Sequence, residues 1–170
     1  AAPEVFLRVL ARCLVVVSGN PYPPRLERLE RLADQLLHNT SARGQTLHGC
    51  QWIRAQDRWL VVREAAAVEA TVPLGTLAAR AWDGRFRIAA NAIKALPRGT
   101  RVGALGTAGH AAFRARAEAL GIPRMACIAL PGFYRRNRLF GAPFFGLASG
   151  SAADLGDGRE GRQADRIINQ

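Results

Sequence analysis

The first part of the chain carries apolar residues at helical spacing. From Pro3 to Val17 they fall close to one stripe, and Ser18-Gly19-Asn20-Pro21 then supplies residues typical of a helix end. Leucines line one face of the stretch that follows Pro24, and this proline suits a first helical turn because its missing N–H has no intrahelical role there. The pattern predicts two helices. The leucines expected to line the second one are Leu26, Leu29, Leu32, Leu36 and Leu37.

Two β-rich runs come next. Residues 45–54 and 58–64 are joined by Ala55-Gln56-Asp57, which predicts an antiparallel hairpin. The segment 82–88 contains an Asp-Gly turn signal and is expected to lead into a third strand. A further short strand is predicted over 101–105.

The remaining pattern predicts one more helix and two short segments. Residues 108–120 are expected to be helical, with Gly121 at the C-terminal end of that helix. The apolar runs 125–130 and 139–147 are interrupted by prolines and are expected to be short. From residue 149 onward Gly, Ser and Asp dominate, so we expect the end of the chain to be mobile.

These elements predict an α+β fold, with N-terminal helices followed by an antiparallel sheet and at least one further helix. A helical segment is expected over 1–40, a basic α+β domain packed with it over 41–147, and a flexible tail over 148–170. The order does not alternate between strands and helices, so it does not indicate a dinucleotide-binding fold.

Composition narrows the class of protein. The chain is 49% hydrophobic but has no apolar run long enough for a membrane-spanning helix. Arg8 and Arg12 interrupt the first apolar segment, which argues against a secretory signal. Cys13, Cys50 and Cys127 are too few and too scattered for a disulfide framework or a metal knuckle. We therefore expect a cytoplasmic protein, and a start at alanine suggests processing or a portion of a longer protein.

Positive charge is large and concentrated in the middle of the chain. The formal net charge is +11, and the window 84–147 contributes +10 because it holds eleven basic residues against the single acid Glu118. Such asymmetry points to a polyanion, with RNA as the leading candidate, although a scattered solvated surface without a partner is the alternative.

Aromatic residues are interleaved with these arginines. Phe86, Phe133, Tyr134 and Phe140 lie next to or between basic residues in the sequence. Aromatic rings and guanidinium planes can stack on unpaired bases, and packing in the core is the competing explanation.

No complete catalytic constellation or metal site is found. Ser18-Gly19 resembles the start of a nucleotide-binding loop but lacks a second glycine and an Asp-Ser, so no nucleotide is assigned to it. Asp83 is expected to orient Arg85 or to cap a turn, since a catalytic role would need a paired acid or base. The three histidines lack metal-ligand spacing and are expected on the surface or in packing: His38, His48 and His110.

Several segments, in order, resemble the C-terminal part of bacterial tRNA(Ile)-lysidine synthetases of the PP-loop ATPase family. The likeness runs from about residue 3 to residue 146. Its most specific pieces are the Thr-Leu-His-Gly-Cys strand and the Trp-Asp-Gly-Arg-Phe turn. The segments that carry it are Tyr22-Pro23-Pro24-Arg25, 43–50, Arg63-Glu64, 82–86, 102–106, 129–131 and Ala142-Pro143.

The resemblance implies that the full-length protein is an ATP-dependent ligase that joins lysine to the wobble cytidine of an isoleucine tRNA. That family's N-terminal catalytic domain carries a Ser-Gly-Gly-x-Asp-Ser loop that has no counterpart in this sequence. ATP with Mg is therefore expected for the full-length enzyme and no cofactor for this chain. Its expected partners are tRNA and the catalytic domain, its oligomeric state stays open, and the chain alone should be inactive.

Arginine suits a phosphate-binding role because its planar fork can contact phosphate oxygens in a bidentate manner. A basic protein-interaction module without direct RNA contact is the alternative function, and an independent enzyme with a dispersed site is a third hypothesis. The residues expected to contact RNA are Arg85, Arg87, Arg98, Arg101, Arg135, Arg136 and Arg138, with Arg25 and Arg43 as weaker candidates.

Overall fold

The computed structural model describes residues 3–38, 44–55 and 58–147, arranged in two compact units. Unit 1 comprises Ala1–Val68 together with Asp83–Arg85, and unit 2 comprises Glu69–Trp82 and Phe86–Gln170. The chain therefore leaves unit 1, returns to it for three residues in the Trp-Asp-Gly-Arg-Phe turn, and leaves it again.

Unit 1 begins with two helices, as the sequence predicts. Helix α1 spans Glu4–Ser18 and buries Leu10 and Leu14. It ends at Gly19, whose φ of 73° permits the left-handed cap and whose N–H donates to the Val15 carbonyl at 3.1 Å. The helix therefore ends at the predicted Ser18-Gly19 segment.

Helix α2 spans Leu26–His38 and confirms most of the predicted leucine face. Leu29, Leu32 and Leu36 are buried. The ends of the expected stripe are not part of this face, because Leu26 and Leu37 are 61% and 52% exposed. At about 100° per residue, both side chains point to one side of the stripe that Leu29, Leu32 and Leu36 form.

The first sheet has three antiparallel strands in the order β1-β2-β3, with bounds Gln45–Leu47, Cys50–Ala55 and Arg58–Arg63. The first predicted strand is thus two strands, separated by His48 and Gly49. Both residues have positive φ, 59° and 68°, as in the tight two-residue turns that match the twist of a hairpin.

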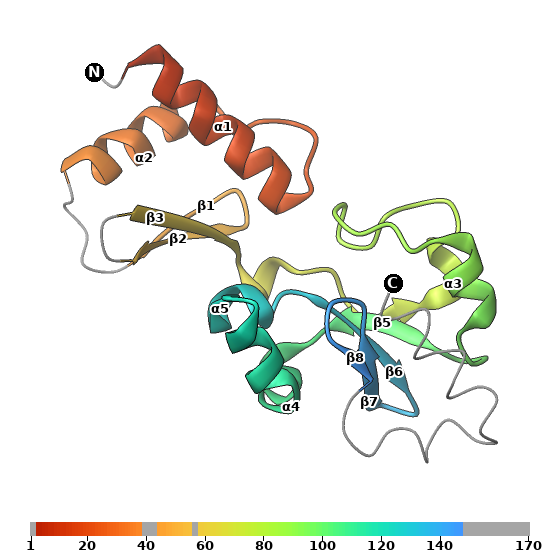
Figure 1. Cartoon of the computed structure of the whole chain (residues 1–170). Helices are drawn as coiled ribbons and strands as arrows, with labels where there is room; N and C mark the ends of the chain where they lie inside the picture. Colours follow the sequence, from red (N-terminus) through yellow and green to blue (C-terminus); the bar gives the residue numbers. More distant parts are fainter. Residues whose placement is uncertain (1–2, 39–43, 56–57, 148–170) are drawn as a thin grey trace. The chain divides into compact units, whose positions relative to one another are not determined.

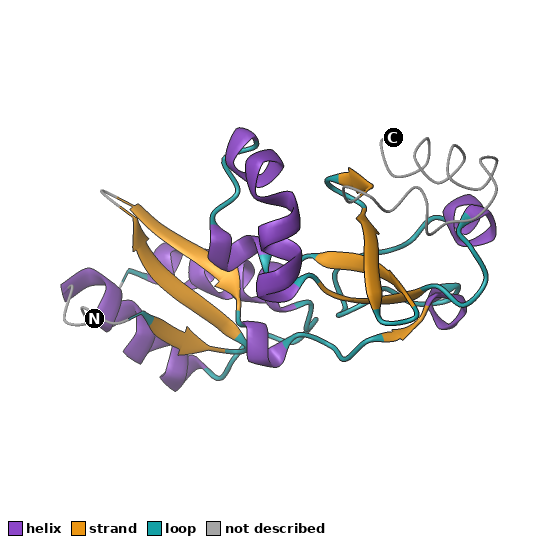
Figure 2. Cartoon of the chain, turned by 90° about the horizontal axis from the view of Figure 1, so that it is seen from below, coloured by secondary structure: helices purple, strands orange, loops and turns teal. Residues whose placement is uncertain are grey.

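Both helices lie on the same side of this sheet (Figures 1 and 2). Their buried leucines pack against Cys50 and Trp52 of β2. The 3₁₀ helix η1, Ala65–Ala67, follows β3. These contacts join α1, α2 and the first sheet in one core.

A buried ion-pair cluster fastens the returning turn to unit 1. The Asp83 carboxylate is 3% exposed and accepts hydrogen bonds from Arg63 at 2.9 and 3.0 Å and from Arg85 Nε at 2.8 Å. Arg63 also donates to the carbonyls of Gly49 and Ala67. The prediction that Asp83 orients Arg85 is confirmed.

Two glycines make this close approach sterically feasible. Gly84 has a φ of 66°, and a Cβ on it would lie 2.2 Å from the Gly19 carbonyl oxygen. A Cβ on Gly19 would lie 2.2 Å from the Asp83 carbonyl oxygen. The stop signal of α1 and the Asp-Gly turn, far apart in sequence, thus meet backbone to backbone.

Unit 2 contains a five-stranded antiparallel sheet in the order β4-β5-β6-β7-β8. The strand bounds are Val72–Pro73, Arg101–Ala104, Pro131–Arg135, Arg138–Ala142 and Gly146–Leu147. Its helices are the 3₁₀ helix η2, Leu74–Leu77, and the α-helices α3, Ala90–Ala95, α4, Gly106–Ala119, and α5, Arg124–Cys127.

The core of unit 2 forms around α4, the helix predicted over 108–120. Phe113 and Ala117 of α4 pack with Cys127 of α5 and with Ala142 and Phe145, and the Phe113 and Phe145 rings stack 5.3 Å apart. The α+β class is confirmed. The third strand predicted over 82–88 is wrong, because only an isolated bridge joins Trp82 to Phe86.

Removing the charge of Asp83 should destabilise unit 1. Asp83→Asn preserves the side-chain shape and tolerates the φ of 52°, but it leaves two largely buried guanidinium groups without their carboxylate. We expect the free energy of unfolding to fall by about 3 kcal/mol in urea titrations. Glu118→Ala, which removes an exposed pair with Arg114, is the control and should leave the midpoint nearly unchanged.

Stability should also fall at alkaline pH because burial raises the pKa of the Cys50 thiol from 9.0 to about 11. Between these values the unfolded chain loses the proton while the folded chain keeps it. The stabilisation is therefore complete below pH 9 and is lost as the pH rises toward 11, by about 3 kcal/mol in all. Urea titrations across this range should show a shallower pH dependence for Cys50→Ala, and an equal dependence would contradict the assignment.

Candidate nucleic-acid interface

The sheet of unit 2 gathers several candidate arginines at one end. In the antiparallel register, Arg101 at the start of β5 lies opposite Tyr134 near the end of β6, and Arg135 pairs with Arg138 at the start of β7. Arg98 lies in the turn that immediately precedes β5. We call this group the arginine end; its members are Arg98, Arg101, Arg135, Arg136 and Arg138.

A tight turn fixes the tip of the arginine end. Arg136 and Asn137 connect β6 to β7 with φ values of 49° and 61°. Two successive positive φ values are those of a type I′ hairpin turn, in which asparagine is one of the favoured residues. The sequence analysis did not predict this hairpin, although the Arg-Asn step between β-compatible residues was a usable signal.

Carboxylates are scarce around the arginine end. In the described part of unit 2, Glu69 and Glu118 are the only acidic residues, against eleven basic ones. Glu69 pairs with Arg80 at 2.5 Å and Glu118 with Arg114 at 3.0 Å. Arg80 and Arg114, which these two carboxylates bind, both lie outside the arginine end.

The remaining candidates lie elsewhere. Arg87 is exposed in unit 2, and Arg25 is exposed at the start of α2 in unit 1. Arg85 is only 12% exposed, since both its Nε and Nη2 bind Asp83, and burial lowers the pKa of its guanidinium. Arg43 lies outside the described residues. Arg85 is thus held inside unit 1, whereas Arg25 and Arg87 remain accessible.

Two of the interleaved aromatics belong to the core. Phe133 and Phe140 are each 3% exposed and stack on one another at 6.2 Å, so packing explains their positions. Tyr134 donates its hydroxyl proton to the Ala104 carbonyl at 2.7 Å, and burial raises the pKa of that hydroxyl. Phe86 is half-buried between Trp82 and Phe144. Phe133 and Phe140 thus pack in the core beneath the strands that carry Arg135 and Arg138.

The described residues show how the metal-ligating side chain types and the Ser18-Gly19 segment are placed. They contain no group of three or more His, Cys, Asp or Glu side chains that could hold a metal ion. The Ser18-Gly19 segment terminates α1, because Ser18 Oγ contacts the Val15 carbonyl and accepts the Asn20 N–H at 3.1 Å. The three thiols are free, and two of them, Cys50 and Cys127, are buried.

Across the ranges that the structure describes, none of the helices has the length and hydrophobicity to cross a membrane.

Comparison with known proteins supplies the relationship that geometry alone does not. A tRNA(Ile)-lysidine synthase from Ruegeria pomeroyi is 33% identical over 158 residues, which is 92% of this chain and 35% of the relative. The chain is homologous to tRNA(Ile)-lysidine synthases. The resemblance seen in the sequence is thereby confirmed.

Two further tRNA(Ile)-lysidine synthases match a shorter region. Those of Wolbachia sp. subsp. Brugia malayi and Wolbachia pipientis wMel are 31% and 30% identical over 84 residues, or 49% of this chain. The chain spans about a third of the length of the Ruegeria relative and a fifth of the Wolbachia ones. No family model matches the chain. No solved structure matches it significantly.

Repulsion among the arginines of the arginine end should lower the stability of unit 2 when no anion is bound. Arg98→Gln removes one exposed cation from this group and should raise the stability of unit 2 by about 0.3 kcal/mol in dilute buffer, because mutual repulsion is reduced. Thermal melts should show the gain disappearing at high salt. Arg114→Gln, which removes a paired arginine, should give no such gain.

Proposed function

We propose that this chain is the C-terminal, tRNA-binding portion of a tRNA(Ile)-lysidine synthase. In that enzyme ATP would drive the joining of lysine to the anticodon wobble cytidine, with ATP and Mg held by a catalytic domain and the reaction taking place in the cytoplasm. The role of this chain would be to bind and position the tRNA. The homology to tRNA(Ile)-lysidine synthases over 92% of the chain supports this proposal.

The observation that carries the binding role is the arginine end of unit 2. Its arginines come from two segments of the sequence, 98–101 and 135–138, which the sheet brings together. The two carboxylates in the described part of the unit pair with Arg80 and Arg114. A-form RNA has a deep major groove that side chains cannot read, so a protein grips it mainly through phosphates and shape. Guanidinium groups on turns and strand ends are suited to such contacts.

A basic protein-interaction module without RNA contact is not favoured, because the relatives are named for a tRNA product. The catalytic domain remains a proposed partner. Helix α1 offers it a surface, since Val5 and Val16 are 73% and 72% exposed and Val9 is 51% exposed. Exposed apolar residues in one row are typical of a protein contact.

The salt dependence of tRNA binding tests the proposal. If about six phosphates are contacted, affinity should fall roughly a thousandfold between about 50 and 200 mM salt. The double variant Arg98→Gln/Arg136→Gln should reduce the slope of log K against log salt by about 2 and weaken binding more than tenfold, by fluorescence anisotropy. A matched control, Arg114→Gln/Arg124→Gln, loses the same charge from α4 and α5.

Three outcomes would contradict the proposal. These are an absence of tRNA binding, an affinity insensitive to salt, and equal losses in the variant and its control. ATP consumption by this chain alone, dependent on lysine and tRNA, would contradict the view that its role is binding.

A further inference from the structure

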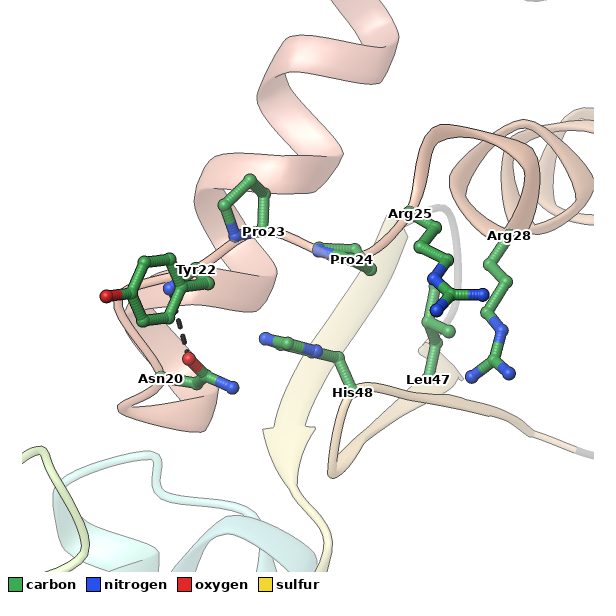
Figure 3. A pocket seen from close by; sticks show the side chains of 8 residues that line it. All are labelled: Asn20, Tyr22, Pro23, Pro24, Arg25, Arg28, Leu47 and His48. Carbon is green, nitrogen blue, oxygen red and sulfur yellow. Dashed lines mark hydrogen bonds between the residues drawn. The ribbon is translucent and has the colours of Figure 1, made fainter.

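Two adjoining hollows in unit 1 form a groove along α2. The first has a volume of about 390 Å³ and lies between the loop 20–24, the start of α2, and the β1–β2 turn (Figure 3). The second, of about 350 Å³, lies between α2 and β1. Both are lined by Arg28 and Leu47, so they lie side by side and share a wall.

One wall of the groove is a row of arginines. Arg25, Arg28 and Arg31 follow each other at a spacing of three residues, and all are exposed. This spacing places them on one side of the helix over about 9 Å of its axis. Successive phosphates of one stacked strand are about 3.4 Å apart along the axis. The row therefore has room for two or three phosphates.

The acidic residues of α2 do not weaken this row by lining the groove. Glu27, Glu30 and Asp34 are exposed and line neither hollow. The helix is thus divided into a buried leucine face, an arginine face and an acidic face. A net charge close to zero for the helix conceals this division, and for this reason the sequence analysis missed Arg28 and Arg31.

The other end of the groove is suited to a base. The Tyr22 side chain is 76% exposed, and the loop that carries it is held by a hydrogen bond from its N–H to Asn20 Oδ1 at 3.0 Å. The His48 ring lies between this loop and the two arginines of the first hollow (Figure 3). Its Nε2 is buried and has no hydrogen-bond partner among the described residues. A buried ring nitrogen of this kind needs a hydrogen-bond partner, which a base or a water molecule can supply.

We infer that this groove binds unpaired nucleotides of an RNA strand. Arg25, Arg28 and Arg31 hold the phosphates, and a base stacks on the Tyr22 ring beside His48. Stacking on an exposed aromatic combined with a basic track is the general means of holding single-stranded RNA. The inference rests on the proposed tRNA-binding function and adds to it a site in unit 1, outside the basic window of the sequence.

Binding of a short fluorescent oligouridylate to the full chain tests the groove. Arg28→Gln/Arg31→Gln should weaken this binding at least tenfold and lower the salt slope by about 1.4, since each single-strand phosphate contributes about 0.7. The matched control is Arg12→Gln/Arg58→Gln, which removes two exposed arginines of unit 1 that line neither hollow. The control should stay within about twofold of the unaltered chain.

A second variant separates stacking from charge and does not depend on the first. Tyr22→Ala alters an exposed side chain, so the fold should be preserved, and thermal melts verify this. It should weaken oligouridylate binding by roughly five- to a hundredfold with an unchanged salt slope. An oligoglutamate of equal charge should compete poorly, because it offers charge without bases.

The outcomes distinguish the groove from the proposed function. If the unaltered chain binds tRNA and oligouridylate while Tyr22→Ala and the arginine variant behave like the control, the groove inference is overturned and the proposed function stands. Equally tight binding of oligoglutamate would also overturn it. If the unaltered chain binds neither RNA, the proposed function itself fails.

Discussion

The buried carboxylate of Asp83 is the constraint on which the architecture of unit 1 depends. It neutralises Arg63 on β3 and Arg85 on the returning turn, and Arg63 in turn satisfies two backbone carbonyls. Two buried cations without this anion would carry a large desolvation cost. Because the turn is anchored in this way, Gly84 is held against Gly19 at the end of α1.

The arginines of this protein differ in their surroundings, and two groups of them stand out. The first group consists of Arg63 and Arg85, which are largely buried and form ion pairs with Asp83. The members of the other group lie at the arginine end of unit 2 and along α2 in unit 1, and all of them are exposed except the half-buried Arg135. Net charge cannot separate these groups, since each arginine counts equally in it. The separation comes from burial and from the position of the few carboxylates.

A binding role that uses both units is consistent with how RNA is gripped. Many guanidinium contacts of moderate strength, distributed over a surface, suit a folded RNA whose phosphates are its most accessible groups. The arginine end offers cations on strand ends and a turn, and α2 offers a groove with an aromatic end. In the proposed enzyme the arginine end would bind phosphates of the RNA backbone, and the groove along α2 would bind unpaired nucleotides.

The sequence by itself determined the helices α1, α2 and α4, the α+β class and the family resemblance, because helical periodicity, Gly and Pro punctuation and short motifs are local properties. It also anticipated that Asp83 orients Arg85, since the two residues are neighbours in the chain.

Only the tertiary structure decided which arginines meet. Strand register brought Arg101 beside the β6–β7 hairpin, and the return of the Asp83 turn to unit 1 buried Arg85. It also showed that Arg28 faces a hollow, which depends on β1 lying beside α2. Such pairings are set by contacts between residues distant in sequence, and no local pattern records them.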